Sequence, residues 1–205
     1  MSKKARARRK PTTQAPLHVL LECVQVVSDY FGTEPKCHEA AVILQTVGKL
    51  LGYDLAPRAV SLVAHDTRTG NVAVFGTIAK DRVPQGRLTV DRSPDPTART
   101  GHIVLTCASP LLLIDATLPQ LASSGIDAPS LVTYIDSVDP ADGRWLTSTP
   151  SGLDLGYMPD PVDTATLLEE WDVPRPMNAL FARDIVRLVR GGMTAEDIRT
   201  KMVVV

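Results

Sequence analysis

Aromatic residues are scarce in this chain, since Phe, Trp and Tyr make up only 4% of its 205 residues. Aliphatic side chains must therefore fill most of the core, and the hydrophobic content of 44% is ordinary for a globular protein. An excess of either charge is also lacking, because the formal net charge is -1. A nucleic-acid-binding surface needs a basic face, so this balance argues against general nucleic-acid binding by the folded body.

Long apolar runs are absent as well. No run approaches the roughly 18 residues of a membrane span, so no membrane partner is expected. The basic start MSKKARARRK is followed by LHVLLECVQVV, which contains His18, Glu22 and Gln25 and has no small-residue cleavage site. This argues against a secretory signal and predicts a cytoplasmic protein. Residues 1–14 are predicted to be a disordered, solvated basic tail, or alternatively a contact for nucleic acid or an acidic partner.

Cysteine is too rare for a disulfide framework. The chain has three, Cys23, Cys37 and Cys107, an odd number without paired spacings. Its four histidines are spread out, and neither Cys-x-x-Cys nor His-Glu-x-x-His occurs. A reducing compartment is therefore expected, and no metal or other cofactor is predicted.

Hydrophobic periodicity predicts an α+β fold in a single domain over residues 15–205. A first helix runs from Leu17 to Phe31, and a second begins near Pro35, capped by Thr33 or Glu34, and ends before Gly52. Residues 136–176 give no clear pattern. The predicted strands are 58–66, 71–80, 87–90, 102–107, 111–115 and 129–135, and the later helices are 177–190 and a short one after Thr194. Helices followed by consecutive strands favour α+β over alternating α/β.

Cys37 lies in the first turn of the second predicted helix. Backbone amides are unpaired there and the helix dipole is positive, so both favour a thiolate over a thiol. The thiolate is the reactive form of cysteine. The alternative is that Cys37 is a small buried hydrophobic residue, as most free cysteines are.

A predicted hairpin brings a histidine and a carboxylate together. If the strands HIVLTC and LLLID pair around a turn at Ala108-Ser109, His102 directly faces Asp115. Opposed side chains point to the same face, with Cβ atoms about 4.5–5.5 Å apart. The carboxylate would then orient the imidazole as in a catalytic triad. The alternative is a weakly stabilising ion pair at a strand end.

These segments resemble the transglutaminase-like cysteine enzymes of papain-like fold. The string CHEAAVILQTVGKLLGYDLAPRAV resembles their nucleophile region, and GHIVL with LLLIDAT resembles their His and Asp strands. The resemblance implies a nucleophile helix packed on an antiparallel sheet, with a C-terminal helical extension. It makes Cys37 the nucleophile, His102 the base and Asp115 the orienting acid. The chain departs from the family in lacking an aromatic residue after His102.

The resemblance implies hydrolysis of an amide bond in a peptide or protein through a thioester, as a protease or deamidase. Acyl transfer between amines and a non-catalytic binding module on the same fold are the alternatives. No Gln or Trp near Cys37 offers an oxyanion donor, so the backbone amides of Cys37 and His38 would serve. His38 and Gln120 are predicted to contact substrate, although a plain surface position is the alternative for Gln120.

Overall fold

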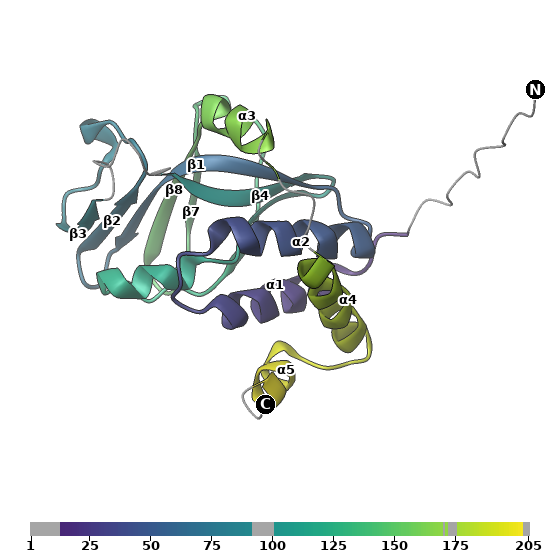
Figure 1. Ribbon diagram of the computed structural model, residues 1–205. Helices are drawn as coiled ribbons and strands as arrows, with labels where there is room; N and C mark the ends of the chain where they lie inside the picture. The colour runs from purple at the N-terminus through teal and green to yellow at the C-terminus, as the bar shows by residue number, and fades with distance from the viewer. Residues whose placement is uncertain (1–12, 92–100, 170, 172–175, 203–205) are drawn as a thin grey trace, which may run out of the picture.

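The computed structural model describes residues 13–91, 101–169, 171 and 176–202, and it has an α+β architecture (Figure 1). Two helices precede the strands and three follow them, which confirms the predicted α+β class, whereas α3, β7 and β8 lie in the stretch 136–176 for which no element was predicted. The helices are α1 (Leu17–Phe31), α2 (Cys37–Leu51), α3 (Pro161–Glu169), α4 (Pro176–Arg190) and α5 (Ala195–Met202), with short 3₁₀ helices η1 (Lys80–Arg82) and η2 (Leu118–Ser124). Within these described segments, no helix has the length and apolar character needed to cross a membrane.

The strands form one eight-stranded sheet in the described part of the chain. They are β1 (Leu55–Asp66), β2 (Asn71–Phe75), β3 (Arg87–Asp91), β4 (His102–Ala108), β5 (Leu111–Asp115), β6 (Leu131–Tyr134), β7 (Trp145–Ser148) and β8 (Leu153–Pro159). The expected purely antiparallel sheet is wrong at one place, because β2 and β3 pair in parallel. β2 and β3 are joined by a connection that returns the chain to the same end of the sheet, and this produces the parallel pair.

The long strand β1 has three neighbours. Val60 pairs with His102 of β4 and with Pro159 of β8, so these two strands lie on opposite sides of β1. Leu62 pairs with Phe75 of β2 and with Tyr157 of β8. β2 and β4 therefore share one edge of β1, end to end, and the start of β4 lies beside the end of β2.

The β4–β5 hairpin has a different register from the predicted one. Cys107 pairs with Leu112 and Leu105 with Ile114, so the turn is Ser109-Pro110 rather than Ala108-Ser109. Proline has no amide hydrogen to give to a strand ladder, which favours Pro110 in the turn. The shift is two residues, so it keeps every side chain on its predicted face. His102 is consequently displaced along the strand from Asp115 instead of directly opposite it.

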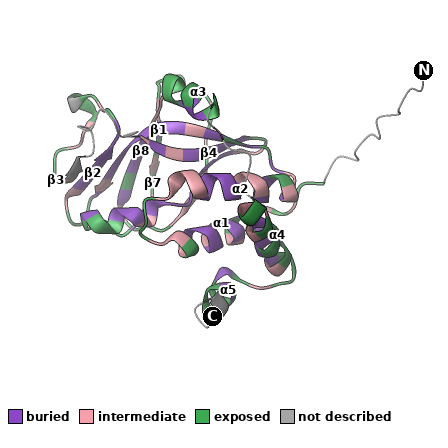
Figure 2. Ribbon diagram, viewed as in Figure 1, coloured by how far each residue is buried: buried purple, intermediate pink, exposed green. Residues whose placement is uncertain are grey.

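One face of β4–β5 carries the helical layer. Leu105, Cys107, Leu112 and Ile114 pack in one buried cluster with α1 and α2, as predicted for the second helix. The C-terminal helices α4 and α5 contribute Ile185, Val189 and Ile198 to this same cluster, and the buried stripes of the helices are visible in Figure 2.

α2 packs unusually close to the start of β1. A Cβ atom on Gly48 would lie 2.6 Å from Leu55 Cγ and 3.0 Å from the Tyr53 carbonyl oxygen. A glycine inside a helix normally costs stability relative to alanine. Here the missing side chain allows the helix to approach the strand.

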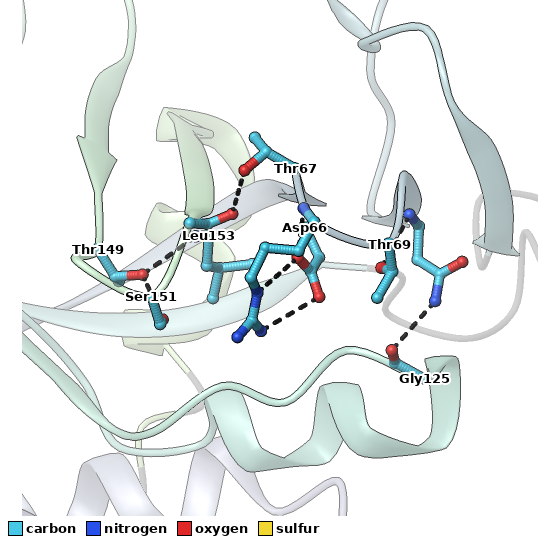
Figure 3. Close-up of polar contacts among 10 residues, drawn as sticks. Asp66, Thr67, Thr69, Gly125, Thr149, Ser151 and Leu153 are labelled. Atoms are coloured by element: carbon cyan, nitrogen blue, oxygen red, sulfur yellow. Dashed lines mark hydrogen bonds and ion pairs between the residues drawn. The ribbon is translucent and has the colours of Figure 1, made fainter.

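The opposite sheet face is covered mainly by η2. Leu118 and Leu121 of η2 pack against Leu113 and Tyr157 in a second buried cluster. The end of η2 is tied to the β1–β2 turn, where the Asn71 side-chain amide donates to the Gly125 carbonyl at 3.1 Å (Figure 3). In the same turn Arg68 donates to the buried Asp66 carboxylate and lowers its pKa. The Asn71–Gly125 bond holds the end of η2, which carries Gln120.

Candidate active site

Cys37 is the first residue of α2 and is partly exposed. Pro35 disfavours a helical conformation at Glu34, so the helix cannot extend back beyond Pro35, and it begins at Cys37. The predicted cap was wrong: Lys36, not Thr33 or Glu34, precedes the first turn, and its carbonyl accepts from the Ala40 amide at 3.0 Å. The amides of Cys37 and His38 precede the first intrahelical bond, so they and the helix dipole favour negative charge at this end.

His102, the first residue of β4, is only 1% exposed. Its Nε2 lies 2.7 Å from Asp115 Oδ2, so the structure brings these two predicted residues together. A diagonal pair two residues apart on neighbouring strands is within reach of long side chains. The shifted hairpin register therefore preserves the contact.

The Asp115 carboxylate is buried and accepts from several donors. The Thr117 amide donates to Oδ1 at 3.0 Å and the Thr117 hydroxyl at 3.3 Å. The Tyr157 hydroxyl donates to Oδ2 at 3.1 Å. A buried carboxylate is costly unless it is paired and hydrogen-bonded, and these donors with His102 satisfy both of its oxygens. An ionised Asp115 accepts only, so Nε2 of His102 carries a proton.

The charges around His102 favour its protonated form. Burial alone would lower the pKa of His102, but the charge and hydrogen bond of Asp115 raise it, together with a hydrogen-bonding interaction with the Cys37 thiol. The result is a pKa raised from 6.5 to about 10. Burial and the Asp115 charge also raise the pKa of Tyr157 well above 10, so this phenol remains a donor.

Gln120 is buried in the site, with 6% of its surface exposed, so the alternative of a surface position is wrong. Its Nε2 lies 3.1 Å from His102 Nδ1. The backbone amide of Gln120 donates to the Thr117 carbonyl, and Ser123 Oγ donates to the backbone carbonyl of Gln120. The two ring nitrogens of His102 therefore face Asp115 and Gln120.

The predicted substrate-contact residue His38 lies beside Cys37 but faces another element. Its ring packs edge-on against Trp171, with centroids 5.0 Å apart. Trp171 Nε1 donates to Gln45 Oε1 at 3.1 Å, and Gln45 lies about two turns after His38 on α2. His38 and Trp171 thus form an aromatic pair on the face of α2 next to that of Cys37.

A narrow cleft lies between α2 and the β4–β5 hairpin. Cys37 and Thr117 are at its polar end, and the rest of its lining is aliphatic: Ala40, Ala41, Leu44, Ile103, Leu105, Ile114 and Ala116. With side chains as they stand, the space of about 10 Å³ has room for about one water molecule. Nothing larger than a water molecule therefore fits beside Cys37 within this cleft.

The other two cysteines are in unreactive surroundings. Cys23 and Cys107 are 0% and 1% exposed. Burial raises the pKa of the Cys23 thiol to about 12. Because the thiolate is the reactive form, Cys23 is an inert thiol within the same chain.

Three residues of the site were not predicted: Tyr157, Thr117 and Trp171. Tyr157 and Trp171 fall in the stretch 136–176 for which no element was predicted. The alternation of Leu153, Leu155 and Tyr157 in β8 is a strand signal that would have placed the phenol on the buried face.

Among the residues that the structure describes, no group of three or more His, Cys, Asp or Glu side chains is arranged to hold a metal ion. The chain matches no family model, no curated protein and no solved structure.

Proposed function

We propose that this protein is a cysteine hydrolase that cleaves an amide bond of a peptide or protein through a thioester, on a transglutaminase-like variant of the papain-like fold. The observation that carries the proposal is the buried His102–Asp115 pair at 2.7 Å, whose imidazole also interacts with a thiol at a helix start. An activated nucleophile needs a base within reach and a third group that orients the base. Cys37, His102 and Asp115 fit these three roles.

In the proposed reaction His102 Nδ1 takes the proton of the Cys37 thiol, because Nε2 is engaged with Asp115. The thiolate attacks the amide carbonyl carbon and forms a C–S bond. The amides of Cys37 and His38 donate to the resulting oxyanion. The C–N bond then breaks as Nδ1 returns the proton to the leaving amine, which gives a thioester and a free amine.

Water completes the cycle. His102 removes a proton from water, the hydroxide adds to the thioester carbonyl, and the C–S bond breaks to release a carboxylic acid and restore Cys37. If a second amine took the place of water, the product would be a new amide and the protein an acyl transferase. Cys37 is partly exposed, so a surface segment of a peptide or protein would reach it from the solvent side.

The test is the pH dependence of alkylation at each cysteine, measured by mass spectrometry in the wild type and in His102→Ala. Cys37 should be alkylated quickly below pH 7, and the His102→Ala variant should lose this rapid alkylation of Cys37. Cys23 is the internal control, since its buried thiol should stay unlabelled in both proteins.

Two outcomes separate the classes of function. Rapid labelling of Cys37 that depends on His102 supports an enzyme, and peptide amides with and without an added amine then distinguish hydrolysis from acyl transfer. If Cys37 reacts no faster than an ordinary thiol, the catalytic proposal fails and a binding module on this fold replaces it.

A further inference from the structure

Gln120 faces the one nitrogen of His102 that the proposed reaction needs. Asp115 accepts a hydrogen bond from Nε2–H, so in the neutral imidazole Nδ1 holds the lone pair. Gln120 Nε2 is 3.1 Å from Nδ1 and is a donor, so it donates to that lone pair whenever the imidazole is neutral. The same lone pair must accept the proton of Cys37.

We infer that Gln120 is a positioning residue that competes with the Cys37 thiol for His102 Nδ1 and so restrains the nucleophile when no substrate is bound. This inference rests on the proposed function. Asp115 favours the protonated imidazole, whereas the Gln120 amide nitrogen favours the neutral one. When His102 takes the thiol proton, Nδ1 becomes a donor, and the Gln120 amide must rotate to present its oxygen or withdraw.

The surroundings of Gln120 make this competition effective. The side chain is buried with 6% exposure, so bulk water does not replace it at Nδ1. Its backbone is fixed in η2 by bonds to Thr117 and Ser123, and its neighbours Leu118 and Leu121 are fully buried. Only the amide group itself is left to change its orientation.

Substitutions of Gln120 with opposite effects test the inference. Gln120→Met keeps the length but removes the donor, so it frees the lone pair for the thiol proton. Gln120→Glu places an acceptor at Nδ1, which holds the proton on His102 and adds a negative charge that opposes the thiolate. The experiment measures the pH midpoint of Cys37 alkylation by iodoacetamide, with NMR of ¹⁵N-labelled histidine to report the protonation of His102.

We expect the midpoint to fall by up to about one pH unit in Gln120→Met, the size of one net hydrogen bond, and to rise in Gln120→Glu. The matched control is Gln25→Met, because Gln25 also bonds through its amide, to Asp29 and Ser130, outside the site. It should leave the midpoint unchanged.

A merely structural role would give a different result. Loss of support for His102 would raise the midpoint, or leave it unchanged, in both Gln120 variants, and either result overturns the inference. Continued protection of Cys23 shows that each variant is folded. If Gln120→Met is unfolded, Gln120→Leu decides the question, because it also removes the donor and only the inference expects its midpoint to fall. If wild-type Cys37 is itself an ordinary thiol unaffected by His102→Ala, the proposed function fails; if only the Gln120 variants show no shift, that function stands and Gln120 is no competitor.

Discussion

The Tyr157 hydroxyl makes a single contact that can be removed without changing the packing. It donates to Asp115 Oδ2 at 3.1 Å inside the core, and Tyr157 is 0% exposed. Tyr157→Phe keeps the aromatic ring in its buried cluster and deletes only the donor. The carboxylate then loses one of the donors that compensate its burial.

The expected cost follows from the charge of the acceptor. A hydrogen bond to a charged group contributes about 1.5–3 kcal/mol to the free energy of unfolding. Asp115 Oδ2 keeps its 2.7 Å contact with His102, so we expect a loss near the lower end, about 1.5–2 kcal/mol. For a chain of this size that corresponds to a fall in Tm of about 3–8 °C.

Urea unfolding followed by tryptophan fluorescence measures this loss, and the m-value should stay constant because the surface exposed on unfolding is the same. The control is Tyr134→Phe, since Tyr134 is 68% exposed and its stability should change by less than about 0.5 kcal/mol. If Tyr157→Phe is as stable as that control, the phenol does not support the Asp115 carboxylate and the description of this buried network is wrong.

Two further predictions concern stability. The pKa of His102 is raised from 6.5 in the unfolded chain to about 10, so the stability it contributes is complete below pH 6.5 and is lost as pH rises toward 10. The free energy of unfolding should fall by a few kcal/mol over this window, and less steeply in His102→Gln. Equal slopes of unfolding free energy against pH in the two proteins, measured by urea titration, would contradict the raised pKa. Gly48→Ala should destabilise the protein by about 1–3 kcal/mol despite the better helix propensity of alanine, because its Cβ would meet Leu55 Cγ at 2.6 Å. A rise in Tm would show that α2 and β1 are not packed this closely.

The elements near the site were predictable because their patterns are local. The apolar stripe of α2 and the glycine after it located the helix that begins at Cys37. The period-two alternation of β4 and β5 placed His102 and Asp115 on one face, and an error of two residues in register left that face unchanged. A one-residue error would have separated them.

Long-range contacts could not be predicted from local patterns in the sequence. Tyr157 reaches Asp115 from 42 positions further along the chain, and nothing in its local pattern names its partner. Gln120 was predicted near the site only by its proximity to Asp115, and its burial depends on how Leu118 and Leu121 dock on the sheet. The parallel β2–β3 pair likewise depends on a connection rather than on strand composition.

The shared edge of β1 has a consequence for how this protein can diversify. The chain leaves the edge of β1 after Phe75 and returns to it at His102, and between these points β3 pairs with β2. Phe75 pairs with Leu62 and His102 with Val60, two residues apart on β1. The two ends of the stretch 76–101 therefore lie close together on the edge of β1, and the entropy of closing a loop within it grows only slowly with loop length. Residues can be inserted or deleted in 76–86, before β3, while His102 keeps its partner Val60, so in the proposed enzyme this connection can vary without moving the histidine.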